Sequence, residues 1–242
     1  MKKLKNVLKY LTLLILLVCL GFVYGFSNAR NGQKTMGEPA IEFQSETNNF
    51  LTQAMVNKLL IQNQKTVQNQ AKSVIDLYQL EEEVLKNPYI EKASLFITID
   101  GTLNTRIQQR QPIARVITSK KTYYLDLQGV EVPLSTNYSA RVPLITGVEK
   151  EEDLVNIMQL LYKIVDDELL KKEVIGIHKD RSDELFLTVR SGNYKIAFGK
   201  LIEINQKLRK LKGFYSKALL DSTLYKYKTI NIKYHNQVVG VK

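Results

Sequence analysis

Residues 87–112 read N-P-Y-I-E-K-A-S-L-F-I-T-I-D-G-T-L-N-T-R-I-Q-Q-R-Q-P, and their pattern decides the fold of the region around them. Apolar and polar residues alternate on both sides of Asp100-Gly101, a dipeptide typical of a tight hairpin turn. The residues expected on one face are Ala93, Leu95, Ile97 and Ile99 before the turn, and Leu103, Thr105 and Ile107 after it. Asn-Pro at 87–88 disfavours a continuing helix. The stretch therefore predicts two antiparallel strands that follow a helix.

The residues upstream of this hairpin predict two helices and one more strand. Leu80, Val84 and Leu85 have helical spacing, with Glu81–Glu83 expected in the first turn, where the helix dipole favours acidic groups. Further upstream, an alternating strand carries Ile41 and Phe43, and a helix capped by Asn48 or Asn49 carries Leu51, Met55 and Leu59. The order strand, helix, helix, strand, strand predicts a small α+β module with its helices on one face of a three-stranded sheet.

Residues 112–242 predict a second, larger domain with a mixed β-sheet and packed helices, so the fold class of the chain is α+β. Strands are expected at 113–117 and 122–127, with a turn at Gln128-Gly129. A second hairpin pairs 185–189 with 194–198 across Ser191-Gly192-Asn193. Helical spacing is found in two apolar sets: Leu154, Ile157, Met158, Leu161 and Val165, and then Leu201, Ile204, Leu208, Leu211 and Tyr215.

Several motifs in fixed order resemble the bacterial cell-division family FtsQ/DivIB. The matching segments are N-P-Y-I-E-K-A-S-L (87–95), G-T-L (101–103), Q-R-Q-P (109–112), P-I-A-R-V (112–116), Y-Y-L-D-L-Q-G-V-E-V-P-L (123–134), V-P-L-I-T-G (142–147) and K-L-R-K-L-K-G-F-Y (207–215). The resemblance implies a POTRA-type domain at 38–111 and an FtsQ β domain at 112–242. Arg110 and Pro112 are then the domain junction, although Pro112 suits an extended linker whatever the function.

The N-terminal segment predicts a membrane anchor. Residues 1–9 contain four lysines and are expected in the cytoplasm, residues 10–29 are apolar and long enough to cross a bilayer, and residues 30–37 form a polar tether. A cleaved signal peptide is the alternative, because Ser27 and Ala29 have the small side chains that a signal peptidase requires. Gly21 and Gly25 form a G-x-x-x-G spacing that lets a second helix approach closely, although glycine is also common in membrane helices.

Charge and cysteine content argue against several classes of protein. The net charge is +11, but six positive charges precede the first acidic residue, Glu38. The rest of the chain has a net charge of +5, and its basic residues are interpreted as scattered along the sequence. Such a distribution gives little support for nucleic-acid binding. The single cysteine, Cys19, lies in the apolar segment, so the exported part cannot form a disulfide. His178 and His235 lack the spacing of a metal site, and no catalytic motif occurs, so neither enzyme activity nor a cofactor is expected.

Residues 227–242, Y-K-T-I-N-I-K-Y-H-N-Q-V-V-G-V-K, predict one terminal strand at a sheet edge. The resemblance implies that this strand and its tail bind the partner FtsB (DivIC), which adds a strand, with Lys233 and Tyr234 as the basic-aromatic pair of the family. The predicted partner-binding residues are Thr229, Ile230, Asn231, Ile232, Lys233, Tyr234, Asn236, Gln237, Val238 and Val239. A strand that only completes the sheet is the alternative.

The resemblance implies a scaffold of the inner (cytoplasmic) membrane at the division septum, with a single span, a cytoplasmic N-terminus and an extracytoplasmic body. Its implied partners are bitopic divisome proteins of the FtsB/DivIC and FtsL type, and also septal synthase proteins of the FtsW/FtsI type, so that it helps to regulate septal cell-wall synthesis. No nucleic acid or small-molecule substrate is expected. Two alternatives are a signal-peptide-cleaved periplasmic protein and a POTRA-containing outer-membrane assembly component, although about 130 residues are too few for a large barrel.

Overall fold

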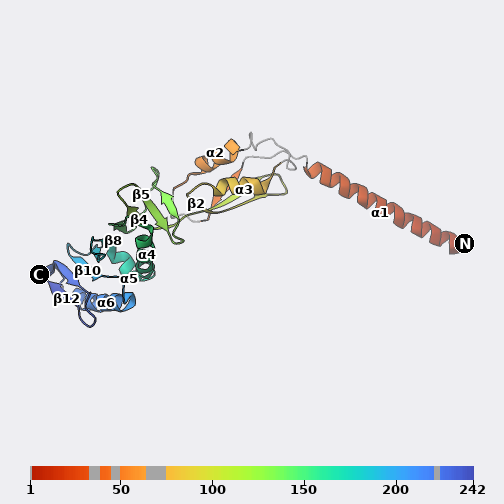
Figure 1. Cartoon of the computed structure of the whole chain (residues 1–242). Helices are drawn as coiled ribbons and strands as arrows, with labels where there is room; N and C mark the ends of the chain where they lie inside the picture. The colour runs from red at the N-terminus through yellow and green to blue at the C-terminus, as the bar shows by residue number, and fades with distance from the viewer. Residues whose placement is uncertain (1, 33–38, 45–49, 64–74, 221–223) are drawn as a thin grey trace. The chain divides into compact units, whose positions relative to one another are not determined.

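A computed structural model of the chain describes residues 2–32, 39–44, 50–63, 75–220 and 224–242 (Figure 1). Within this part the chain forms two compact units, Met1–Gln109 and Arg110–Lys242. The elements of the first unit are α1 (Lys2–Gly32), β1 (Ala40–Phe43), α2 (Gln53–Asn63), α3 (Leu77–Leu85), β2 (Ile90–Ile97) and β3 (Leu103–Gln109). The predicted order of strand, helix, helix, strand and strand is confirmed after the N-terminal helix.

Helix α1 contains one segment, Leu8–Asn31, that is long and apolar enough to cross a membrane. None of this segment is buried against the rest of the described protein. Its apolar side chains therefore need another environment to cover them, because large exposed apolar surfaces mark membrane or protein contacts. Both membrane anchors and N-terminal signal sequences have this length and composition.

The first unit has a three-stranded sheet of order β1-β3-β2, with β1 parallel to β3 and β2 antiparallel to it. One apolar cluster holds the sheet to its helices: Leu51, Val56, Leu60, Leu80, Val84, Ile90, Leu95, Leu103 and Ile107. The hairpin turn is at Asp100-Gly101, as predicted, where Gly101 has a φ of 103° that favours glycine. Ile99 was expected on the buried face, but it lies beyond the end of β2 and is 86% exposed.

Helices α2 and α3 begin at other residues than the sequence pattern suggested. Helix α2 begins at Gln53 and buries Val56 and Leu60, whereas Met55 is 39% exposed. The helix therefore buries Val56 and Leu60, each one position after the predicted Met55 and Leu59. Leu51 is buried as predicted, but it packs into the core before the helix begins. The proposed caps Asn48 and Asn49 lie outside the described residues.

Helix α3 begins at Leu77, with Asp76 as its N-cap, and not at Leu80. The Asp76 carboxylate accepts a hydrogen bond of 3.0 Å from the backbone N–H of Gln79, which satisfies a free donor of the first turn. The acidic residues Glu81–Glu83 therefore lie beyond the first turn, and their favourable placement near the helix N-terminus was wrong.

In its described residues, 110–220 and 224–242, the second unit contains a nine-stranded sheet and three α-helices. Its elements are β4 (Pro112–Ile117), β5 (Thr122–Asp126), β6 (Glu131–Pro133), β7 (Leu144–Thr146), α4 (Glu151–Val165), α5 (Glu168–Glu173), β8 (Val174–Lys179), β9 (Leu185–Val189), β10 (Lys195–Gly199), α6 (Ile204–Leu220), the 3-10 turn η2 (Leu224–Lys226), β11 (Thr229–Asn231) and β12 (Val239–Val241). The strand order is β12-β11-β10-β9-β8-β7-β4-β5-β6. The sheet therefore ends at β6 on one side and at β12 on the other.

One apolar core joins all three helices to the sheet. It includes Ile157 and Leu161 of α4, Leu170 of α5 and Leu211 of α6, all at most 1% exposed. These residues recur at helical spacing, so each amphipathic helix turns one face toward the strands. Asp167 caps α5 by accepting hydrogen bonds from the backbone N–H groups of Leu169 and Leu170, both at 3.1 Å. The mixed sheet with packed helices matches the predicted fold class.

Candidate functional site

The segment after α6 forms two short strands joined by a turn, so the prediction of one terminal strand was wrong. β11 lies between β10, to which it is parallel, and β12, to which it is antiparallel. Thr229, Ile230 and Asn231 of β11 therefore have a strand on each side. The open edge at this end of the sheet is β12, Val239–Val241.

A side-chain turn explains why the single strand does not form. The Asn231 side-chain oxygen accepts a hydrogen bond of 3.0 Å from the backbone N–H of Lys233, a local turn that bends the chain away from the extended direction. Between them, Ile232 is fully buried, and its N–H donates to the carbonyl oxygen of Ala197 at 3.1 Å. The alternating pattern therefore predicted correctly that the side chains of Ile230 and Ile232 are buried. The strand itself, however, ends at Asn231.

Helix α6 fixes the turn that leads into β12. The Lys210 ammonium donates to the carbonyl oxygens of Ile232, at 3.2 Å, and of Tyr234. The Gln206 amide donates to the carbonyl oxygen of His235 at 3.2 Å. The turn carbonyls would otherwise depend on water, because they have left the strand ladder. Two side chains of α6 therefore set the direction in which the chain enters β12.

A buried lysine of the same helix contributes to this end of the domain. Lys207 is 3% exposed, and its ammonium donates to the carbonyl oxygen of Lys200 at 2.7 Å. The ammonium also lies 4.8 Å from the centre of the Phe198 ring. Burial lowers the pKa of Lys207, because a low-dielectric environment disfavours the charged form. Lys207 thus anchors the start of α6 from inside.

The glycine at position 240 allows strand β12 to lie close to the ring of Tyr227. A Cβ at Gly240 would lie 2.3 Å from Cε1 of Tyr227, far inside van der Waals contact. The side chain of Val238 packs against the core, whereas Val239 and Val241 are 37% and 51% exposed. The edge strand therefore has one face on Tyr227 and presents two half-exposed valines.

The two members of the predicted basic-aromatic pair lie in different environments. The Lys233 ammonium forms an ion pair of 2.8 Å with the Glu184 carboxylate, and its aliphatic stem passes close to Gly199. Tyr234 is 51% exposed, and Asn236 and Gln237 are exposed in the turn before β12. Sequence reasoning alone could not assign the Lys233 charge to Glu184, which is 49 positions away.

The predicted junction residues lie at the start of the second unit. Arg110 donates from Nη1 to Oδ2 of Asp126 at 2.7 Å, and Pro112 begins β4 opposite Asp126. The glycines Gly21 and Gly25 face open space on α1, because a Cβ at either position would have no described atom within 4 Å beyond the neighbouring backbone of the helix itself. The junction therefore has a defined ion pair, whereas the glycine spacing has no described contact.

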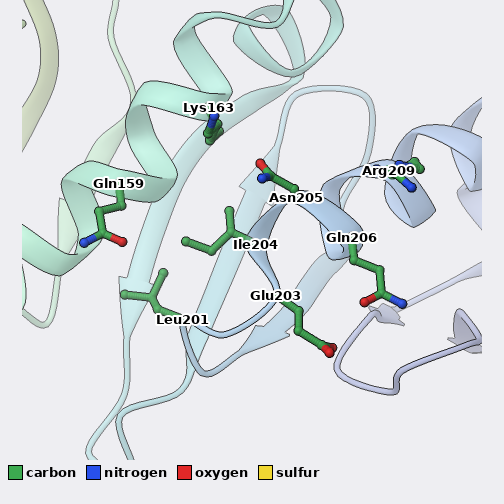
Figure 2. A pocket seen from close by; sticks show the side chains of 8 residues that line it. All are labelled: Gln159, Lys163, Leu201, Glu203, Ile204, Asn205, Gln206 and Arg209. Atoms are coloured by element: carbon green, nitrogen blue, oxygen red, sulfur yellow. The ribbon is translucent and has the colours of Figure 1, made fainter.

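An open depression of about 630 Å³ lies between α4 and the first turns of α6. Figure 2 shows the side chains that line it: Gln159, Lys163, Leu201, Glu203, Ile204, Asn205, Gln206 and Arg209. These residues are amides, charged groups and aliphatics, a set without a Ser, Cys or His nucleophile beside a base. Among the described residues, no group of three or more His, Cys, Asp or Glu side chains is arranged to hold a metal ion.

Comparisons with known proteins agree with the division into two units. The family described as FtsQ/DivIB, C-terminal related, matches residues 111–241, and a POTRA-like domain matches residues 40–108. The cell division protein FtsQ of Geotalea daltonii is 25% identical over 178 residues, covering 69% of this chain and 63% of the relative. The corresponding FtsQ of Rhodothermus marinus is 22% identical over 178 residues, covering 68% of this chain and 65% of the relative. The chain thus spans slightly less than two thirds of the length of these curated relatives.

A solved structure, that of the major extracytoplasmic domain of the trans isomer of the cell division protein DivIB from Geobacillus stearothermophilus, is also similar. It has a TM-score of 0.33 and 19% identity, covering 48% of this chain and 97% of the solved chain. The family match over residues 111–241 covers more than half of the chain, together with a POTRA-like domain before it. The chain belongs to the FtsQ/DivIB family of bacterial cell-division proteins.

Proposed function

We propose that this chain is a non-catalytic, bitopic scaffold of the division septum, anchored by α1 with its N-terminus in the cytoplasm. Its two folded units then lie outside the cytoplasm and bind membrane-anchored division proteins of the FtsB/DivIC and FtsL type, and through them help to regulate septal cell-wall synthesis. Proteins of the FtsW/FtsI type are further candidates for the complex. Family membership and the apolar helix α1 support the proposal.

The observation that carries the partner-binding part is the open edge at β12. β12 has β11 on one side and no strand on the other within the described residues. An open edge can accept a strand from another polypeptide through main-chain hydrogen bonds. The opposite edge, β6, contains Pro133, which has no N–H to donate. We therefore assign partner binding to β12 and the adjacent exposed residues Tyr234, Asn236 and Gln237.

A proline in the edge strand tests this assignment. Val239→Pro removes an N–H from β12, and we expect the full-length protein in detergent to lose its co-purifying division partners. Ile232→Pro is unsuitable, because the Ile232 N–H is already bonded to Ala197 and the side chain is buried. The matched control is Glu131→Pro in the opposite edge strand β6. Equal retention of partners by the wild type and by Val239→Pro, at unchanged thermal stability, would rule out strand addition at β12.

The anchor is tested by fractionation. A retained α1 keeps the protein at full length in the inner membrane after high-salt and carbonate washing. Cleavage after Ala29 would instead release a soluble product that begins at Arg30, which mass spectrometry distinguishes.

A further inference from the structure

In the sheet of the first unit, the chain enters at the same end at which the β2–β3 hairpin turns. β1 is parallel to β3, so Ala40, the first residue of β1, lies beside Asn104 near the start of β3. β2 and β3 are antiparallel, and their pairing ends toward the turn with Ile97 beside Leu103. The hairpin turn and the beginning of β1 therefore lie at one end of the sheet.

The hairpin projects beyond β1 at this end. Phe96 pairs with Asn104, which pairs with Ala40 on its other side, so these three residues lie at one level of the sheet. Ile99 follows Phe96 by three positions, and three residues of extended chain span roughly 10 Å. The tip of the hairpin thus extends past Ala40, on the side from which the chain reaches β1.

An isoleucine occupies the tip of this hairpin. The N–H of Gly101 donates to the carbonyl oxygen of Thr98 at 3.1 Å, so Ile99 and Asp100 are the two central residues of the turn. Such positions are usually taken by Gly, Pro, Asn, Asp or Ser, because these residues favour the turn itself. The Ile99 side chain is 86% exposed and does not contribute to the core of the unit. Its apolar character therefore suits a contact outside the folded module.

A tyrosine lies toward the same end. Helix α3 packs along β2, and only residues 86–89 join the two elements, so the helix and the strand run in opposite directions. The hydrogen bond between the Leu95 N–H and the Glu81 carboxylate agrees with this arrangement. Tyr78, in the first turn of α3, is 73% exposed and lies on the side of the hairpin turn. A tyrosine ring with its polar hydroxyl suits a boundary between lipid and water.

The length of chain between α1 and β1 limits how far this end of the module can lie from a membrane. The segment of α1 that is able to span a bilayer ends at Asn31, and β1 begins at Ala40, nine residues later. Nine residues reach at most about 30 Å even when fully extended. The hairpin projects from Ala40 on the side where this connection arrives, so the connection favours an orientation with the hairpin tip toward the bilayer.

We infer that the tip of the β2–β3 hairpin contacts the lipid surface, with the Ile99 side chain among the lipid headgroups and the Tyr78 ring at the interface. The inference rests on the proposed function, because it requires α1 to remain in the membrane. The contact need not be strong by itself, since α1 already holds the module close to the bilayer and raises the effective concentration of the tip.

The chain contains no tryptophan, so one introduced tryptophan is a unique reporter. The full-length Ile99→Trp variant is reconstituted into phosphatidylcholine vesicles, with and without phosphatidylcholine brominated in the upper part of its acyl chains. Zwitterionic lipid is used because the carboxylate of Asp100, beside the tip, would be repelled by an anionic surface. We expect bromine to quench the tryptophan fluorescence by at least about twofold, as for an indole at the membrane interface.

The matched control is Lys86→Trp, at an exposed position after the last turn of α3, which is the end of the module away from the hairpin tip. It carries the same reporter, so the preference of tryptophan for interfaces is common to both variants. We expect its fluorescence to change by less than about 1.2-fold. Equal quenching of the two variants would overturn the inference. A blue-shifted but unquenched Ile99→Trp would place the tip against protein and would also overturn it.

A second measurement avoids tryptophan altogether. Amide hydrogen exchange of residues 98–102 is compared in phosphatidylcholine vesicles for the wild type, Ile99→Leu and Ile99→Ser. We expect exchange in the wild type and in Ile99→Leu to be at least about threefold slower than in Ile99→Ser, because only the apolar side chains hold the tip at the lipid surface. Equal exchange in the Leu and Ser variants would contradict the inference.

Flotation of the same vesicles separates this inference from the proposed function. If the protein floats with the vesicles after carbonate washing and Ile99→Trp is not quenched, the anchor stands and the lipid contact of the hairpin is rejected. If the protein does not float with the vesicles, the anchor fails, and the inference that depends on it fails as well.

Discussion

Arg110 and Asp126 form an ion pair in which Nη1 of Arg110 donates to Oδ2 of Asp126 at 2.7 Å. The Asp126 side chain is 1% exposed and that of Arg110 is 19% exposed. The other carboxylate oxygen of Asp126 accepts the backbone N–H groups of Gln128, at 3.0 Å, and of Val130, at 2.8 Å. The first residue of the second unit is thereby joined to the β5–β6 turn.

Replacement of Arg110 by Ala is expected to lower the free energy of unfolding of the second unit by about 3 kcal/mol, because it leaves a buried carboxylate without its cation. Asp126→Asn should cost less, since the amide oxygen can still accept backbone N–H groups. Chemical denaturation of both single variants and of the double variant measures the coupling. Additive losses would show that the two side chains do not act as a pair.

The ion pair illustrates what the sequence pattern could and could not predict. The motif at 109–112 marked Arg110 as a junction residue by resemblance, but nothing in the spacing identified Asp126 as its partner. Periodicity predicted the first hairpin, the turn at Gly129 and the buried faces of α4 and α6, because these depend on local alternation and turn chemistry. Pairings between distant segments depend on tertiary structure, which a single sequence does not display.

The error at the C-terminal segment has the same cause. Ile230 and Ile232 alternate with polar residues as in a strand, yet a hydrogen bond to the Asn231 side chain bends the chain just after β11. The chain then returns as β12, Val239–Val241, which pairs antiparallel with β11. An Asn beside a β-branched run can either remain in the strand or form a local turn. The choice here is supported by Lys210 and Gln206 of α6, residues far away in sequence. The open edge was therefore expected along a single strand within residues 227–242, and it is confined to Val239–Val241.

Gly240→Ala is expected to separate β12 from the domain, because the new Cβ would lie 2.3 Å from Cε1 of Tyr227. Amide hydrogen exchange at Val239–Val241 should become faster, and partner retention should fall, while the midpoint of thermal unfolding changes little. The matched control is Gly213→Ala in α6, where a Cβ has open space and alanine favours the helix by about 1 kcal/mol. Tyr227→Leu in the Gly240→Ala background should restore protection. Unchanged exchange in Gly240→Ala would mean that the ring moves aside.

Asp167 is expected to stabilise the second unit in a pH-dependent way. A hydrogen bond from Lys212, at 2.6 Å, and two backbone N–H groups of α5 lower the pKa of Asp167. A carboxyl group whose pKa is lower in the folded state stabilises the fold above its unfolded pKa, and this contribution is lost as the pH falls through the folded value. Asp167→Ala should cost about 1 kcal/mol at neutral pH. The difference from the wild type should shrink below about pH 4.

Asp167→Asn separates the two roles of this residue. The amide keeps an acceptor for the helix N-terminus but removes the ion pair with Lys212, which is half exposed. We expect a loss of only a few tenths of a kcal/mol, roughly the value of a surface pair. Urea unfolding at neutral and acidic pH measures both variants, and a loss in Asp167→Asn as large as that in Asp167→Ala would contradict a capping role.

Glu81 lies beside strand β2 of the first unit, the longest edge strand among the described residues. β2 lies at the end of the sheet order β1-β3-β2, so its outer main-chain groups have no strand partner among the described residues. One of them, the N–H of Leu95, donates to Oε2 of Glu81 at 3.2 Å. A carboxylate placed at an open edge blocks an incoming strand both by occupying a donor and by its charge.

Glu81→Ala is therefore expected to increase self-association of the first unit within the full chain, because it exposes an N–H in the middle of an eight-residue edge strand. Sedimentation of the detergent-solubilised protein over a concentration series measures the effect. The matched control is Glu82→Ala, which removes the same charge from the same helix, where Glu82 is exposed and makes no hydrogen bond to β2. If Glu81→Ala remains as monodisperse as Glu82→Ala, the carboxylate contributes to local structure but does not guard the edge, and the distinction between a closed β2 and an open β12 fails.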